Sequence, residues 1–140
     1  MTLYLIDTDV ISEVRKGEKA NPGVRQFFDA ADRDNIPMFL SAVTIGEMRQ
    51  GVESIRHRGD EPQARSLERW LSRAIDRFDD AILSFDRETA EIWGRLRVPN
   101  RENPLDKQIA ATALINDLIV VTHNTAHYAP TGVRLLNPFT

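Results

Sequence analysis

The feature that most constrains the fold of this chain is a regular alternation of short apolar runs with longer amphipathic segments. Five runs have the length and the apolar, β-branched character of buried strands: LYLID (3–7), MFLSAV (38–43), AILSF (81–85), IVVTH (119–123) and VRLLN (133–137). Segments with helical spacing separate these runs: 9–16, 21–34, 44–58, 61–78, 86–97 and 103–118. Because parallel strands need crossover connections, this order predicts an α/β fold, a three-layer α/β/α sandwich with a mostly parallel sheet of four to five strands.

Length and composition narrow the class of protein. A chain of 140 residues is long enough for one domain, expected to span 1–140, that buries roughly two-thirds of its unfolded surface. The absence of cysteine excludes a disulfide framework and a thiolate metal site, which is typical of a reducing compartment. The opening MTLYLIDTDVIS has no basic start and meets an aspartate at position 7, so we expect neither a signal peptide nor a membrane span, and a cytoplasmic location.

Acidic residues follow the predicted strands. Asp7 ends the first strand and Asp9 comes two residues later; Glu47 follows the second strand, and Asp106 lies at the start of the helix that leads to the fourth. In a doubly wound sheet the carboxyl ends of the strands meet at one edge, and ligands bind there. We therefore expect Asp7, Glu47 and Asp106 to converge.

Each acid except Asp7 also has a purely structural explanation. Asp9 is placed to be the N-cap of the first helix. Glu47, three residues after Thr44, fits a capping box, and Asp106 occupies the third position of a helix capped by Asn103, where the helix dipole favours an acid. Asp7 has no predicted hydrogen-bond donor close to it in the sequence, so a carboxylate at this strand end is the hardest of the four to explain by structure alone.

A metal ion accounts for the convergence better than three separate caps. Carboxylates that share a site repel one another, raise one another's pKa and lower stability unless a cation lies between them. With no cysteine and three histidines in the chain, the ligands are oxygen atoms, which indicates Mg²⁺ or Mn²⁺ rather than zinc.

Four ordered segments carry a resemblance to a known family. LIDTDVISE, SAVTIGEMRQG, LDKQIAATAL and IVVTHNTAHY followed by VRLLNP are similar to the successive motifs of the PIN-domain ribonucleases, and in particular of the VapC toxins of toxin–antitoxin pairs. The resemblance implies an Mg²⁺- or Mn²⁺-dependent endoribonuclease with RNA, tRNA among the candidates, as substrate. It also implies a homodimer and a small VapB-like antitoxin that covers the site. By position it assigns Asp7, Glu47 and Asp106 as catalytic carboxylates and metal ligands.

Two positions depart from the family pattern. Asp9 stands where asparagine is usual and adds a charge, and the closing segment offers Asn124 and His127 where the family often has a fourth acid. We expect Asn124 to supply a neutral oxygen ligand and Asp9 to restore the total charge. Thr122, at the end of the fourth strand, is a further supporting candidate that could hydrogen-bond a water molecule or a phosphate, although a structural role is the simpler interpretation of a threonine at a strand end.

Arginines recur every four residues along 61–78. They could follow an RNA backbone, but interleaved acids favour a solvated surface held by ion pairs within the helix. The arginines are Arg65, Arg69, Arg73 and Arg77, and the acids are Glu68, Asp76 and Asp79.

Two other classes of function stay open. DTDVI is close to the D-x-D-x-[TV] nucleophile motif of haloacid-dehalogenase-type phosphatases, but that class needs a later lysine, and the only candidate, Lys107, directly follows its acid. A catalytically silent PIN-fold binding module is the other alternative, because the fourth acid is missing.

Overall fold

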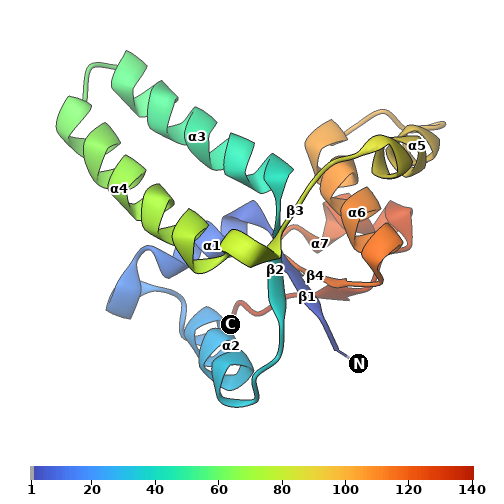
Figure 1. Cartoon of the computed structure of the whole chain (residues 1–140), viewed down its shortest axis with the longest axis horizontal. Helices are drawn as coiled ribbons and strands as arrows, with labels where there is room; N and C mark the ends of the chain where they lie inside the picture. The colour runs from blue at the N-terminus through green and yellow to red at the C-terminus, as the bar shows by residue number, and fades with distance from the viewer. Residues whose placement is uncertain (1) are drawn as a thin grey trace.

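The protein is built around a sheet of five parallel strands. The computed structural model describes residues 2–140, and the strand order is β3-β2-β1-β4-β5 (Figure 1). The strands are β1 (Tyr4–Ile6), β2 (Met38–Ser41), β3 (Ile82–Leu83), β4 (Ile119–Val121) and β5 (Leu135–Leu136). All four neighbouring pairs are parallel. The predicted α/β class is therefore confirmed, and the expected strands at 81–85 and 133–137 are shortened to two residues each.

Helices cover both faces of this sheet. The first face carries α1 (Thr8–Val14), α2 (Pro22–Arg33), α3 (Ala42–His57) and α4 (Glu61–Arg77), and the second carries α5 (Arg87–Leu96), α6 (Pro104–Asn116) and α7 (Thr125–Tyr128). Short 3₁₀ turns lie at Gly17–Lys19, Asp79–Ala81 and Ala129–Thr131. The arrangement is the predicted three-layer sandwich. No helix within residues 2–140 combines the length and the apolar character needed to cross a membrane.

The two apolar cores follow the alternation of side chains along the strands. Ile6 and Val121 face the core shared with α1 to α4, whereas their neighbours Leu5 and Val120 face the core beneath α6 and α7. All four side chains are fully buried. Strands covered on both faces read as continuous apolar runs, which is why the sequence pattern located them.

The helices α3 and α4 form a long antiparallel hairpin that extends away from the sheet (Figure 1). Leu71, Ala74 and Phe78, which recur at helical spacing, are buried. Five charged side chains join the two helices on the outside through ion pairs, with Arg56 contacting three carboxylates. We call this group the α3–α4 ion cluster: Arg49, Glu53, Arg56, Glu61 and Glu68.

Some predicted helix caps are wrong. The capping box of Thr44 and Glu47 does not form, because α3 already begins at Ala42 and is capped by Ser41, whose hydroxyl accepts from the Val43 N–H (3.0 Å). Asn103 does precede α6, but it has left-handed backbone geometry (φ 54°) and its side chain makes no capping hydrogen bond. Glu47 is thus released from its predicted capping role, whereas Asp106 does occupy the third position of α6, where the helix dipole favours an acid.

Candidate functional site

Asp7 is held at the carboxyl edge of the central strand. It follows β1 directly and only 3% of its surface is exposed. Its Oδ1 accepts from the Thr8 backbone N–H (2.8 Å), which makes Asp7 the N-cap of α1, and its Oδ2 accepts from the Thr122 hydroxyl (2.8 Å). Two sequence interpretations are therefore wrong: Asp7 does have a local donor, and Asp9 is not the cap, because α1 begins one residue earlier than expected.

Asp9 lies in the first turn of α1 and is partly buried. Its Oδ2 accepts from the His123 backbone N–H (3.0 Å), which ties α1 to the segment that follows β4. Its Oδ1 is buried and has no hydrogen-bond partner in the described chain. A buried oxygen without a partner is costly, so this atom is available to a ligand that enters the site.

Glu47 approaches from α3 and is held by a residue that the sequence analysis missed. Its Oε1 accepts from the Thr8 hydroxyl (2.7 Å), and the hydroxyl oxygen of Thr44 lies 3.3 Å from that of Thr8. Thr8 therefore connects the start of α1 to α3. The only local signal was its place between Asp7 and Asp9, because its partner Glu47 is 39 residues away.

Asp106 comes from the other layer of helices, in the first turn of α6. Its Oδ2 lies 2.8 Å from Nδ1 of His127, an exposed residue of α7. Thus His127 contacts one of the predicted acids. Asn124, the residue before α7, is exposed and its side chain makes no capping hydrogen bond, so its amide oxygen is free to turn toward the site.

The carboxylates act on one another electrostatically. Burial, followed by the nearby charge of Asp9, raises the pKa of Asp7 to about 7, and Asp106 contributes in the same direction. Burial raises the pKa of Glu47, with Asp106 and Asp9 adding to the effect. It also raises the pKa of Asp9, to which Asp106 again contributes. We call these four residues, Asp7, Asp9, Glu47 and Asp106, the acid site. Their charges act on one another, and the expectation that Asp7, Glu47 and Asp106 are catalytic carboxylates and metal ligands stays a prediction.

The donor set of the acid site fits a hard divalent cation. Its charged groups are all carboxylates, one of their oxygens is buried without a partner, and like charges raise the pKa of three of them. Within residues 2–140, however, no three histidine or acidic side chains are close enough to ligate one ion as they stand. Mg²⁺ is commonly bound through one or two carboxylates and several water molecules, and such a site does not need three converging side chains.

Thr122 contributes by holding an acid. It is fully buried, donates to Asp7, and its hydroxyl oxygen accepts from the Asn124 N–H (3.0 Å). Its hydroxyl is thus already engaged in two hydrogen bonds within the chain, and a bond to a water molecule or phosphate stays a prediction. The structural role is therefore the one observed, and it bears directly on the site because its partner is Asp7.

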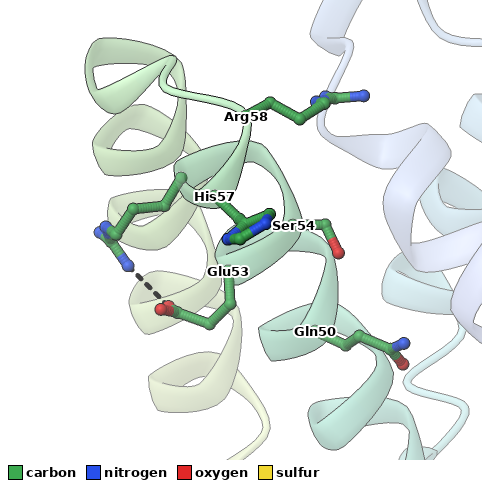
Figure 2. Close-up of a pocket in the computed structure, with 6 residues that line it drawn as sticks. Gln50, Glu53, Ser54, His57 and Arg58 are labelled. Atoms are coloured by element: carbon green, nitrogen blue, oxygen red, sulfur yellow. Dashed lines mark hydrogen bonds and ion pairs between the residues drawn. The ribbon is translucent and has the colours of Figure 1, made fainter.

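The hollow beside the acids is a small one. A cavity of about 150 Å³ adjoins Thr8 and Glu47 and is also lined by Ser12, Arg15 and Trp70. A larger hollow of about 710 Å³ lies beside the second half of α3 and includes no member of the acid site. Figure 2 shows its lining: Glu53 forms an ion pair on one side of the helix, and Gln50, Ser54 and Arg58 extend from the other.

The arginine stripe of α4 does not behave as predicted. Glu68 pairs with Arg49 and Arg56 of α3 instead of the arginines of its own helix. Of the stripe, Arg77 pairs with Asp32 of α2 (3.4 Å). The other three are exposed and form no ion pair within the described chain: Arg65, Arg69 and Arg73. The prediction that acids of α4 hold this stripe is wrong, because the long hairpin places α3 closer to Glu68.

Comparison with known proteins identifies the family. A family model for the PIN domain matches residues 4–131, and the chain belongs to the PIN-domain family. It is similar to the plasmid stability protein StbB of Pseudomonas syringae pv. tomato, at 31% identity over 144 residues that cover 98% of this chain and 99% of that protein. It is also similar to toxin FitB of Neisseria gonorrhoeae, at 30% identity over 142 residues that cover 98% of this chain and 99% of that protein. VapC ribonuclease Y4jK of Sinorhizobium fredii is 25% identical over 142 residues, with 98% of each chain covered.

Solved structures give the same result. FitAB bound to an IR36 DNA fragment matches with a TM-score of 0.83 and 28% identity, covering 99% of this chain and 96% of that one. DNA-bound VapBC from Salmonella typhimurium matches with a TM-score of 0.76, and the match covers 97% of this chain and 98% of that one. At 22% identity this similarity shows the fold alone. The predicted resemblance to PIN-domain VapC proteins is confirmed, and the phosphatase alternative is set aside.

Proposed function

We propose that this protein is a metal-dependent endoribonuclease, the toxin of a VapBC-type toxin–antitoxin pair. The single observation that carries the proposal is the acid site, in which Asp7 at the carboxyl end of β1 and acids of α1, α3 and α6 raise one another's pKa. The similarity to a protein named VapC ribonuclease and to toxin FitB supports the same activity.

The residues of the acid site divide into ligands and the groups that hold them. Asp7, Glu47 and Asp106 would hold Mg²⁺ or Mn²⁺, with Asp9 and Asn124 in support. The bound ion supplies Lewis-acid stabilisation of the scissile phosphate and lowers the pKa of a water molecule. Thr122 fixes Asp7 and Thr8 fixes Glu47 through hydroxyl hydrogen bonds of 2.8 and 2.7 Å. These bonds orient each carboxylate before RNA arrives.

Positive side chains near the acids favour a polyanionic substrate. Arg15 lines the cavity that also includes Glu47, and the exposed arginines of α4 lie on the helix that forms its other wall. Cations placed beside an acidic site attract the phosphates that the acids alone repel. We propose RNA as the substrate, with tRNA as the first candidate.

The partners and location follow from the same family. Solved relatives include the FitAB and VapBC complexes. We propose that a small VapB-like antitoxin binds this protein and covers the acid site, that the free protein is a homodimer, and that both act in the cytoplasm.

Cleavage by the purified, antitoxin-free protein tests the proposal. Structured RNA and a small phosphate ester are incubated side by side with Mn²⁺, with Mg²⁺ and with EDTA. We expect cleavage of RNA with either metal, none with EDTA, and no hydrolysis of the ester. Failure to cleave any RNA, by protein that still binds the metal, would instead favour the catalytically silent module.

A further inference from the structure

Tyr128 is a buried tyrosine that packs beneath the acid site without belonging to it. It is the last residue of α7 and none of its surface is exposed. Its ring lies in the apolar core of the second face, together with Leu5, Ile109 and Val120. The ring position is therefore fixed by packing, as for any core aromatic side chain.

The hydroxyl of Tyr128 is not explained by that packing. It is buried and has no partner at full hydrogen-bond geometry among residues 2–140, although a weaker hydrogen bond toward Asp7 contributes to the shift of its pKa. Burial raises its pKa far above the usual value, and the carboxylate of Asp7 is the strongest of the charges that add to this shift, ahead of Asp106. Tyr128 shares its core cluster with Leu5 and Val120, which precede Asp7 and Thr122 by two positions, so the tyrosine lies beside the strands that lead to this pair.

A buried donor without a well-formed hydrogen bond destabilises the fold, so phenylalanine would be the better residue for packing alone. The adjacent Asp7 can take a further hydrogen bond. A carboxylate offers roughly four acceptor positions, and Asp7 accepts from the Thr8 N–H and the Thr122 hydroxyl. Because the hydroxyl is inaccessible, it acts on the reaction through Asp7 and not by touching RNA.

We propose that Tyr128 is a positioning residue of the acid site, whose hydroxyl donates a third hydrogen bond to Asp7 when that carboxylate holds the cation. This inference rests on the proposed function, because it requires Asp7 to bind a metal. Three donors then converge on Asp7 from different elements: the backbone of α1, the end of β4 and the end of α7. Such a carboxylate cannot rotate away from the ion.

The test compares Tyr128→Phe with Tyr4→Phe, the only other tyrosine in the chain. Tyr4 lies on β1 and its ring packs edge-on against Phe27 at 4.9 Å. Mn²⁺ binding is measured by titration calorimetry without RNA, and Thr122→Val, which removes an observed donor to Asp7, serves as the reference for such a loss. Since one hydrogen bond contributes about 0.5–1.5 kcal/mol, we expect Tyr128→Phe to bind Mn²⁺ about 2- to 12-fold more weakly and Tyr4→Phe to bind it as the wild type does.

Two further measurements separate positioning from packing. In EDTA we expect Tyr128→Phe to be at least as stable as the wild type, and with Mn²⁺ and RNA its kcat should fall while KM stays unchanged. Equal Mn²⁺ affinity in Tyr128→Phe and wild type would overturn the inference and leave the proposed function standing. A wild-type protein that binds no Mn²⁺ would overturn both.

Discussion

Two regions of this molecule gather acidic side chains, and they do so in opposite ways. In the α3–α4 ion cluster each acid meets an arginine at the surface, and the Arg49 and Arg56 guanidinium groups lower the pKa of Glu68. In the acid site the acids meet one another at the sheet edge, and burial raises the pKa of Asp7 to about 7. Acids of the first kind are compensated by arginines of the chain, whereas Asp7, Asp9 and Glu47 form no ion pair among residues 2–140. The two regions therefore differ in whether positive side chains of the chain neutralise their carboxylates, and not in how many acidic residues they contain.

The largest expected difference between the regions is in RNA cleavage. Asp7→Asn and Asp106→Asn should each reduce the cleavage rate by about 100-fold or more, because loss of one preorganised charged group typically has that effect on transition-state stabilisation. Glu68→Gln, which alters the α3–α4 ion cluster, should cleave at the wild-type rate. Circular dichroism verifies the fold of each variant, and full activity of either aspartate variant would remove the proposed site.

The pH dependence of stability comes next. The pKa of Asp7 is higher in the folded chain, at about 7, than its ordinary value of 3.8, so between these values the native state binds more protons than the unfolded state. Metal-free protein should therefore be most stable at the acidic end and lose on the order of 2–4 kcal/mol as the pH rises from 5 to 8. Urea unfolding in EDTA measures this loss. Asp7→Asn should flatten the profile, and an equally steep profile in that variant would contradict the assignment.

The metal requirement should respond to the charge of the closing segment. Asn124→Asp adds a carboxylate near the cation, and we expect it to lower the Mn²⁺ concentration for half-maximal cleavage about threefold to tenfold, since affinity in oxygen sites rises with ligand charge. Asn124→Ala should raise it. His127→Asp should act like Asn124→Asp, because His127 already lies 2.8 Å from Asp106. An unchanged requirement in both Asn124 variants would place that residue outside the site.

The smallest expected effect is the relief of repulsion in the metal-free chain. Asp106→Asn removes a charge that acts on Asp7, Asp9 and Glu47. We expect its Tm in EDTA to rise by about 2–4 °C and the stabilisation by Mn²⁺ to disappear. A variant with a lower Tm in EDTA and an unchanged Mn²⁺ shift would instead indicate that Asp106 mainly stabilises the start of α6.

The order of the elements was predictable because it depends on periodicity. Strands buried on both faces are apolar throughout, so the sheet and the acids that follow its strands could be located from the sequence. The first residues of α1 and α3 could not be predicted in this way. The pattern from Thr44 to Glu47 resembles a helix start wherever it occurs, but α3 is capped by Ser41, three residues earlier.

The supporting groups of the site could not be found in the same way. Thr8 and Thr122 are ordinary residues in local sequence, and their roles come from hydrogen bonds to partners 39 and 115 positions away. From the sequence Tyr128 resembles a core residue, and its ring does pack in the core. Only the three-dimensional packing shows that its hydroxyl lies near an acid from the other end of the chain.

The parallel pairing of β1 with β4 also determines when the site can exist. Asp7 is synthesised before its Thr122 partner, which follows 115 residues later. At about 5–20 residues per second, translation takes roughly 6–23 s to cover that distance. During this interval β1 lacks its β4 neighbour, α6 is absent or incomplete, and the carboxyl edge has not formed. The acid site therefore cannot form until β4 and Thr122 have been synthesised.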